Sequence, residues 1–516
     1  MAYKKGITKF PGAGSQQTFD ALSEVSDSFC LAKWLQVTLH LQNGHNHSCH
    51  HPVTHRADED EIANNPNALH NTLYKKAKQA QMLTGERPTE CQYCWNIEDI
   101  GKDSDDTSFA SDRIHKSGDI TWAGTNQIQP LLDKIKRGEK INPRYVEISF
   151  SNVCNFKCSY CSPVHSSLWT SEIKNKGPYE LLSNPGHNNL EWLEKEDKLP
   201  IHHKDYNPYV EAFWEWWPDL VQDLVSFRIT GGEPLLEENT FKAIKMLQES
   251  ETGSLKEMSI NSNACVPDEV IDRYILEMNK LLDSGKVEIS RFFTSCDTHG
   301  EQAEYIRHGF DYKRWLKNVD KILTEIPKSR VTIMCTANLM SLPRFHLFLQ
   351  DVHALKKKHW NNPLKGRDQG LTLDIPILRH PAHQSVAILP STYADMLTPS
   401  LAYITSHWVD GPNRDAWTKR TTNKFSPDLL QDIQEDDKMF TDLEMQRFQR
   451  LIKSVEEDVN VNEGVNSKTS MIDFYLFVNE HDRRRGTDFK KTFPELMDFY
   501  RLCEEEHNKR IMVRNI

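Results

Sequence analysis

Several features common in other protein classes are missing from this sequence. No apolar run in its 516 residues approaches the roughly 20 residues that a membrane-spanning helix requires. The lysines within residues 1–14 are not followed by the apolar core of a secretory signal. We therefore expect a cytoplasmic protein with no membrane partner.

An excess of positive charge is also lacking. The chain has 63 Lys and Arg against 74 Asp and Glu, a net charge of -11, and it contains no long basic run. Non-specific nucleic-acid binding depends on a basic surface, so the sequence does not indicate nucleic acid as a partner. What the chain does contain is 11 cysteines. In a reducing compartment these are expected to be metal ligands or small buried residues rather than disulfides.

A fourth cysteine is missing from the segment 151–163, where Cys154, Cys158 and Cys161 have the spacing C-x3-C-x2-C. Three thiolates on one loop can hold three irons of a [4Fe–4S] cluster, because soft sulfur ligands select such clusters. The fourth iron then has no ligand from this loop and is open to a small molecule. A site that only carries electrons would normally be closed by a fourth cysteine. The alternative is a zinc knuckle completed by a distant His or Cys.

A glycine-rich motif, Gly231-Gly232-Glu233-Pro234, follows the predicted strand 226–230. Glycine allows close approach of the backbone to a ligand, and a carboxylate can accept a hydrogen bond from an ammonium group. Together with the three cysteines, this motif resembles the radical S-adenosylmethionine (SAM) superfamily. The resemblance implies that a [4Fe–4S] cluster binds SAM and cleaves it reductively. The resulting 5′-deoxyadenosyl radical would then abstract hydrogen from a substrate.

The resemblance also implies roles for individual residues. Tyr160 would pack beside the adenine, and the segment around Glu233 would receive the amino group of SAM. Polar residues at the ends of later strands would bind the ribose and carboxylate, with Arg307 suited to the carboxylate. An ordinary surface arginine is the alternative for Arg307. The cofactor-binding residues predicted in this way are Tyr160, Thr230, Gly231, Gly232, Glu233, Pro234, Asn261, Asn263, Ser295, Asp297 and Arg307.

A second group of cysteines precedes this region. Asn43-Gly44 predicts a hairpin turn, and a helix is expected over 68–83. The arrangement resembles the twitch or SPASM-type extensions of radical SAM enzymes, which hold an auxiliary iron–sulfur cluster, although those extensions usually follow the barrel. The competing interpretation is a structural zinc, with a nearby histidine replacing one cysteine. The ligands predicted for this auxiliary cluster or zinc are Cys30, Cys49, Cys91 and Cys94, and the candidate replacements are His50, His51 and His55.

The predicted fold is α/β, with a partial (β/α)6 TIM-like barrel, a cysteine-rich hairpin module before it and a helical extension after it. Six β-rich runs separated by helical patterns support the barrel: 144–150, 226–230, 258–263, 287–294, 330–338 and 371–378. The domain boundaries that we predict are 1–26 for a tail, 27–125 for the hairpin module, 140–380 for the barrel with an insertion at 172–203, and 390–516 for the extension. The arginines at 483–485 are expected on a solvated face or a helix end.

The sequence therefore predicts a radical SAM enzyme, similar to uncharacterised twitch-containing proteins of bacterial and phage genomes. A maturase that acts on a peptide or protein is one hypothesis. Alternatives are an enzyme of nucleotide or small-molecule metabolism and a non-catalytic iron–sulfur or zinc protein on the same scaffold. The resemblance implies SAM and an electron donor such as flavodoxin or ferredoxin as partners. The substrate is not revealed by the sequence.

Overall fold

The fold is taken from a computed structural model. The described residues are 15–100, 112–117, 128–183, 186–250, 255–360, 370–409, 434, 437–457 and 467–514. The chain divides into two compact units, which are described separately. Unit 1 comprises residues 1–152, 197–260 and 277–290, and unit 2 comprises residues 153–196, 261–276 and 291–516.

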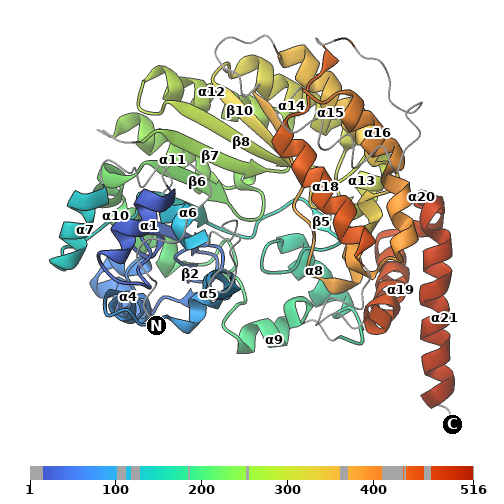
Figure 1. The fold of residues 1–516 in the computed structure, drawn as a ribbon, viewed down its shortest axis with the longest axis horizontal. Coiled ribbons are helices and arrows are strands. Elements are labelled where there is room, and N and C mark those ends of the chain that lie inside the picture. Colours follow the sequence, from blue (N-terminus) through green and yellow to red (C-terminus); the bar gives the residue numbers. More distant parts are fainter. Residues whose placement is uncertain are drawn as a thin grey trace. The chain divides into compact units, whose positions relative to one another are not determined.

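Unit 1 is built on a mostly parallel sheet whose strands have the order β3-β2-β1-β4-β6-β7 (Figure 1). The strand β1 pairs in parallel with β4, so that Thr38 lies opposite Glu147. β2 then returns antiparallel to β1, which confirms the hairpin at Asn43-Gly44. The first arm of that hairpin is thus part of the same sheet as the predicted barrel strands. The bounds are β1 Gln36–His40, β2 His45–His47, β3 His55–Arg56, β4 Tyr145–Ser149, β6 Ser226–Thr230 and β7 Glu257–Ser262.

Alternation along these strands separates an apolar face from a polar face. Val146 and Ile148 of β4 are fully buried, as are Phe227 and Ile229 of β6. Successive side chains of a strand point to opposite faces, so the intervening polar residues share the other face. On that face Glu147 lies opposite Arg228, with a carboxylate-to-guanidinium distance of 3.6 Å.

Helices of unit 1 lie both before and between the strands. Part of the predicted tail forms α1, where Leu22 is fully buried in an apolar cluster with Phe29 and Leu35, and residues 1–14 lie outside the described part. Burial of Leu22 explains why this segment is ordered as a helix. The helix expected over 68–83 is divided into a short 3-10 turn and α4. The bounds are α1 Ser15–Ser23, α2 Ala32–Leu35, α3 Glu59–Asn64, η1 Pro66–Leu69, α4 Leu73–Leu83, α5 Gln92–Ile100, α6 Asp112–Ser117, α7 Ile128–Lys136, α10 Pro208–Asp223 and α11 Glu238–Glu249.

Unit 2 contains the later strands, in the order β8-β10-β11, together with a two-stranded ribbon of β5 and β9. β10 and β11 are parallel, and β5 and β9 are antiparallel. All six predicted barrel strands are therefore present, and the fold is α/β with a largely parallel sheet. The bounds are β5 Lys157–Cys158, β8 Ile289–Ser295, β9 Arg307–His308, β10 Ser329–Met334 and β11 Leu371–Asp374, with α8 Ser167–Lys176, α9 Leu190–Lys195, α12 Asp268–Asp283 (shared between the units), α13 Gly300–Ile306, α14 Tyr312–Glu325 and α15 Phe345–His359.

The described part of the chain after residue 390 is largely helical, as predicted, and it packs back onto unit 2. Glu444 accepts a hydrogen bond from the Leu373 backbone of β11 and forms a buried ion pair with Lys356. The helices α19 and α21 run side by side (Figure 1). The bounds are α16 Thr398–Ser406, α18 Asp442–Glu456, α19 Ser467–Arg485, α20 Phe489–Thr492 and α21 Met497–Arg514.

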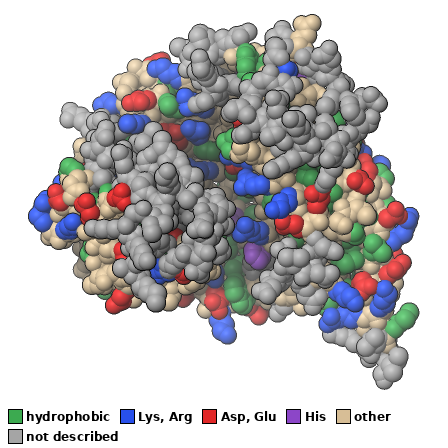
Figure 2. All heavy atoms as spheres, viewed as in Figure 1, with side chains coloured by type: hydrophobic (Ala, Val, Ile, Leu, Met, Phe, Trp, Pro, Cys, Tyr) green, Lys and Arg blue, Asp and Glu red, His purple; other side chains and the backbone are tan. Residues whose placement is uncertain are grey.

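Two surface properties bear on partners. None of the helices in the described ranges is long and apolar enough to cross a membrane. Lys and Arg side chains are interspersed with Asp and Glu side chains on the face drawn in Figure 2. This mixture fits the net charge of -11.

Candidate functional site

The three-cysteine loop follows β4 and is held in a fixed conformation within unit 2. Its middle forms β5, where Cys158 lies opposite Arg307 of β9. The backbone amide of Cys161 donates to the Cys158 carbonyl at 3.0 Å. The Cys154 sulfur accepts from the Phe156 amide at 3.4 Å. The loop is therefore ordered by its own backbone and by β9.

Arg307 connects this loop to the end of β8. Its Nε and Nη2 each donate to the Asp297 carboxylate at 2.9 Å, and its Nη1 lies 3.8 Å from the Cys158 sulfur. The Tyr160 hydroxyl donates to the same carboxylate at 2.8 Å. Arg307 is buried, so the alternative of an ordinary surface arginine is wrong. Three of the predicted site residues and one predicted ligand thus form one network.

Asn263 also contacts the loop. Its amide donates to the Asn155 side chain at 2.7 Å, and Asn155 in turn donates to the Cys265 carbonyl at 3.0 Å. Asn261 and Ser295 lie near the ends of β7 and β8 and are partly buried. Asn263 therefore supports the loop through Asn155. This contact was not part of its predicted role.

On its other side the loop contacts α8. Ser166 caps this helix by accepting from the Trp169 amide, and Gly177 ends it with a φ of +75°. This fixes the helix so that Trp169 and Glu172, three residues apart, face the loop. The Trp169 indole donates to the Cys158 carbonyl at 2.9 Å, and Glu172 accepts from Lys157 at 2.7 Å.

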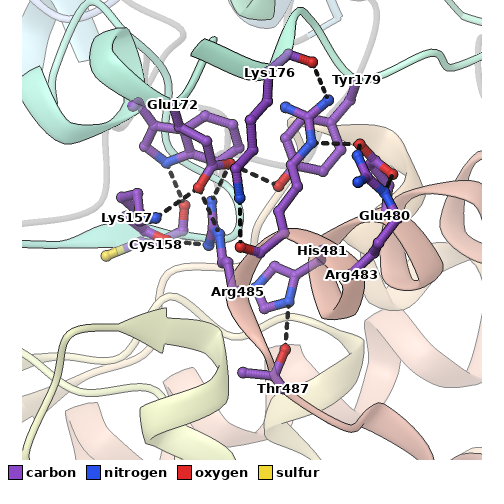
Figure 3. Close-up of polar contacts among 12 residues, drawn as sticks. Lys157, Cys158, Glu172, Lys176, Tyr179, Glu480, His481, Arg483, Arg485 and Thr487 are labelled. Carbon is purple, nitrogen blue, oxygen red and sulfur yellow. Dashed lines mark hydrogen bonds and ion pairs between the residues drawn. The ribbon is translucent and has the colours of Figure 1, made fainter.

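Arg485, the last residue of α19, completes this contact region (Figure 3). Its Nη1 donates to the Lys157 carbonyl, and its Nε and Nη2 lie 3.3 and 3.4 Å from the Glu172 oxygens. Its guanidinium lies 4.7 Å from the centre of a Trp169 ring, and its side chain is 0% exposed. Burial acts to raise the pKa of Glu172, but Arg485 and Lys157 outweigh this effect and lower that pKa to about 2.

The contacts of Arg485, Glu172 and Trp169 with the loop were not predicted from the sequence. The spacing of the apolar residues along α19 does indicate that Arg485 faces inward. The buried residues Phe474, Phe477, Val478 and His481 recur at intervals of three and four, and the same stripe continues to Arg484 and Arg485. Arg483 lies off this stripe, and its side chain is 66% exposed.

The glycine motif lies in unit 1 against the end of β4. Gly231 has a φ of +125°, and a Cβ placed on it would lie 2.6 Å from the Ser149 hydroxyl and 2.9 Å from the Ser151 carbonyl. The Gly232 amide donates to the same carbonyl at 3.3 Å. Only glycine fits this position, because any side chain would collide with the strand end. Ser151 precedes Cys154 by three residues, so the motif abuts the segment that leads into the cysteine loop.

The neighbours of Gly231 are also ordered. Glu233 is buried, and its carboxylate accepts from the Leu235 amide at 3.0 Å, which caps the 3-10 turn η6 Pro234–Leu236. The Thr230 hydroxyl lies 3.4 Å from the Ile148 carbonyl. Both side chains are thus fixed by backbone contacts within unit 1.

The residues of the loop fit an iron–sulfur cluster. Three cysteines lie on one ordered loop, and the sulfurs of Cys154 and Cys158 each accept an N–H, as cluster thiolates do. Burial raises the pKa of Cys161 to about 12, an effect that Arg307 and Arg485 partly offset. Binding of a metal would replace the protons of such thiols.

The four N-terminal cysteines are brought together in unit 1. All of them line one pocket, with a buried arginine and two lysines in the same wall. The arginine, Arg113, forms an ion pair with Glu98 at 2.8 Å, and Lys33 pairs with Glu90. The lining residues are Cys30, Ala32, Lys33, Ser48, Cys49, His51, Pro52, Met82, Cys91, Cys94, Trp95, Asp112, Arg113 and Lys116.

The geometry of the cysteines bears on the metal. Across the described ranges, no three His, Cys, Asp or Glu side chains converge so as to bind one metal ion. Structural zinc requires four ligands around a single point. In an iron–sulfur cluster each thiolate binds its own iron, so the sulfurs lie around a larger body. Of the candidate replacements, only His51 lines the pocket.

The middle of the chain is similar to proteins of known family. Residues 148–348 match the sequence model of the Radical SAM superfamily. Curated relatives named GTP 3′,8-cyclase are 25% identical in Sulfurovum sp. (30% of this chain, 39% of the relative), 27% identical in Actinobacillus pleuropneumoniae (32% and 39%) and 26% identical in Sulfurimonas denitrificans (38% and 48%). The matches span less than half of the length of these relatives. The chain thus contains a radical SAM domain.

Proposed function

We propose that the protein is a radical SAM enzyme whose cluster is held by Cys154, Cys158 and Cys161. The observation that carries the proposal is the ordered three-cysteine loop within the segment that matches the superfamily. When bound, the cluster and SAM supply a 5′-deoxyadenosyl radical that removes hydrogen from a substrate. The protein binds and orients these groups.

The roles of the polar residues follow from the family pattern and from their contacts. Glu233 and the backbone at Gly231 and Gly232 would receive the amino group of SAM. Arg307 is held by Asp297 with one N–H directed at Cys158, so we assign it to positioning the loop as well as to the carboxylate of SAM. Tyr160 is fixed by the same carboxylate. Asn261, Asn263 and Ser295 remain candidates for contacts with the ribose.

The direct test is SAM cleavage by anaerobically reconstituted protein with dithionite as electron source. The wild-type protein is expected to form 5′-deoxyadenosine, and the triple variant Cys154→Ala/Cys158→Ala/Cys161→Ala is expected to form none. Cys503→Ala, which removes a buried cysteine of α21, is the matched control and should retain activity. Wild-type protein that binds SAM without cleaving it would favour a non-catalytic scaffold.

For the substrate we favour a nucleotide over a peptide. All three relatives are named for an enzyme that acts on GTP. The polar face of the unit 1 sheet, with the Glu147–Arg228 pair and the Tyr145 hydroxyl 3.3 Å from Glu147, suits a substrate that forms hydrogen bonds and carries charge. Addition of GTP or another nucleoside triphosphate is expected to accelerate 5′-deoxyadenosine formation. Acceleration by peptides alone would favour a maturase.

We further propose that Cys30, Cys49, Cys91 and Cys94 hold a second [4Fe–4S] cluster. Their shared pocket supports a site for one metal group. Lys116 lines the same pocket, and a cation beside the site suits an anionic cluster. The twitch-like identity of this segment rests on the same cysteines.

A further inference from the structure

The C-terminal helix α19 reaches the cysteine loop through a single side chain. Arg485 is separated from Lys157 by more than 300 residues, yet its guanidinium donates to the Lys157 carbonyl, immediately before Cys158 (Figure 3). The same guanidinium packs on Trp169, whose indole holds the Cys158 carbonyl at 2.9 Å. Arg485 therefore supports two consecutive peptide groups of the loop, one directly and one through Trp169.

Neighbouring contacts keep Arg485 in place. Arg484 donates to the carbonyls of Gly177 and Pro178 at 2.8 and 3.0 Å, just beyond α8, and lies 4.1 Å from the Tyr179 ring centre. Lys176 donates back to the Arg484 carbonyl at 2.8 Å. The end of α19 and the end of α8 are thus tied together. This fixes the position from which Arg485 extends to the loop.

Two cations face one carboxylate beside the loop. Glu172 is the carboxylate that faces two cations, Lys157 at 2.7 Å and Arg485 at 3.3 Å. The side chain of Glu172 is 3% exposed and that of Arg485 is 0% exposed, so water screens their charges weakly. Arg307 and Asp297 neutralise each other beside them. Lys157 and Arg485 thus place two positive charges against the one negative charge of Glu172, next to the peptide that carries Cys158.

We propose that Arg485 positions the three-cysteine loop and raises the reduction potential of the cluster that the loop holds. Reduction adds one negative charge to the cluster, and a buried cation nearby stabilises the reduced form more than the oxidised form. This assigns a role in electron uptake to the C-terminal extension. The inference rests on the proposed function, because it requires a cluster at Cys154, Cys158 and Cys161.

The test is a redox titration of the reconstituted protein with dithionite and mediators, without SAM, followed by electron paramagnetic resonance. Arg485→Met keeps the length of the side chain and removes its charge and hydrogen bonds. We expect its equilibrium constant for one-electron reduction to fall at least tenfold, which corresponds to about 59 mV. Arg485→Lys should remain closer to the wild-type value. Arg483→Met removes an exposed neighbour of the same run and should change the constant less than twofold.

A second variant gives a change of opposite sign. Glu172→Gln removes the negative partner and leaves Lys157 and Arg485, so its equilibrium constant for reduction should rise. If Arg485→Met fails to retain iron, the reduction potential of Glu172→Gln tests the inference in its place. Arg485→Met with full iron and an unchanged potential, or Glu172→Gln with an unchanged or lower potential, would overturn the inference. Wild-type protein that binds no cluster at these cysteines would instead refute the proposed function.

Discussion

The Asp297 carboxylate accepts both Nε and Nη2 of Arg307 at 2.9 Å, and both side chains are buried. The pair is bidentate, the geometry in which a guanidinium binds a carboxylate most specifically. The Thr336 amide and the Tyr160 hydroxyl donate to the same carboxylate. Asp297 therefore joins the end of β8, the segment after β10 and the cysteine loop through one carboxylate.

Asp297→Asn is expected to destabilise the apoprotein strongly. Removal of one partner of a buried ion pair leaves an uncompensated charge and typically costs about 3–5 kcal/mol. The free energy of unfolding, measured in urea, should fall by this amount. Asp272→Asn removes an aspartate that pairs with Lys321 on the surface and should cost about 1 kcal/mol or less. Equal losses in the two variants would contradict the structural role of Asp297.

Gly231→Ala tests the close approach of the glycine motif to β4. The added Cβ would lie 2.6 Å from the Ser149 hydroxyl, so the strand end must shift. Gly285→Ala is the matched control, because Gly285 also has a positive φ, +73°, but its Cβ would meet no atom within 4 Å. The control should cost roughly 1–2 kcal/mol of stability from backbone strain alone. Gly231→Ala should cost about 1–3 kcal/mol more from overpacking.

The two glycine variants should also differ in SAM affinity, measured by equilibrium binding to the reconstituted protein. Gly231→Ala should weaken binding, because it displaces the backbone that we assign to the amino group of SAM. Gly285→Ala should bind SAM as the wild-type protein does. Unchanged affinity in Gly231→Ala would remove this motif from the proposed SAM site.

Local patterns were sufficient to predict the strands and the cysteine loop. The runs 226–230 and 330–338 contain β-branched and apolar residues; β6 coincides with the first run, and β10, Ser329–Met334, overlaps the second. The parallel pairing of β1 with β4 could not be predicted. Its register joins Thr38 to Glu147, more than 100 residues apart, and no local signal specifies a partner at that distance.

At the candidate site too, a partner that is distant in the sequence could not be predicted, as the arginines at 483–485 show. A basic run is usually solvated, because burial of a charge is costly without a partner. The partner of Arg485 is Glu172, on a helix more than 300 residues earlier in the chain. The stripe of Phe474, Phe477 and His481 indicates which arginines face inward, but it does not identify the carboxylate that receives them.

Stability should depend on pH through Glu172. Its pKa is lowered from 4.5 to about 2 in the folded protein, so folding favours the charged form. Its contribution to stability is therefore complete above pH 4.5 and is lost as pH falls towards 2. The melting temperature of the apoprotein should fall across this range, and Glu172→Gln should show a lower melting temperature at neutral pH with a shallower fall. Glu180→Gln changes an exposed residue nearby and should follow the wild-type curve. A Glu172→Gln curve parallel to the wild type would contradict the assignment.

The pocket lined by the four N-terminal cysteines leads us to expect a second iron site, whose iron can be removed without loss of the iron at the three-cysteine loop. Cys91 and Cys94, three residues apart, are both buried in its wall. Burial raises the pKa of the Cys91 thiol to about 12, so a metal must displace its proton. We expect reconstituted wild-type protein to contain about eight irons, and Cys91→Ser/Cys94→Ser to contain about four. The triple alanine variant of Cys154, Cys158 and Cys161 should lose the other half, so each set of changes is the control for the other. If the double variant instead keeps all of its iron and loses about one zinc, these cysteines hold a structural zinc.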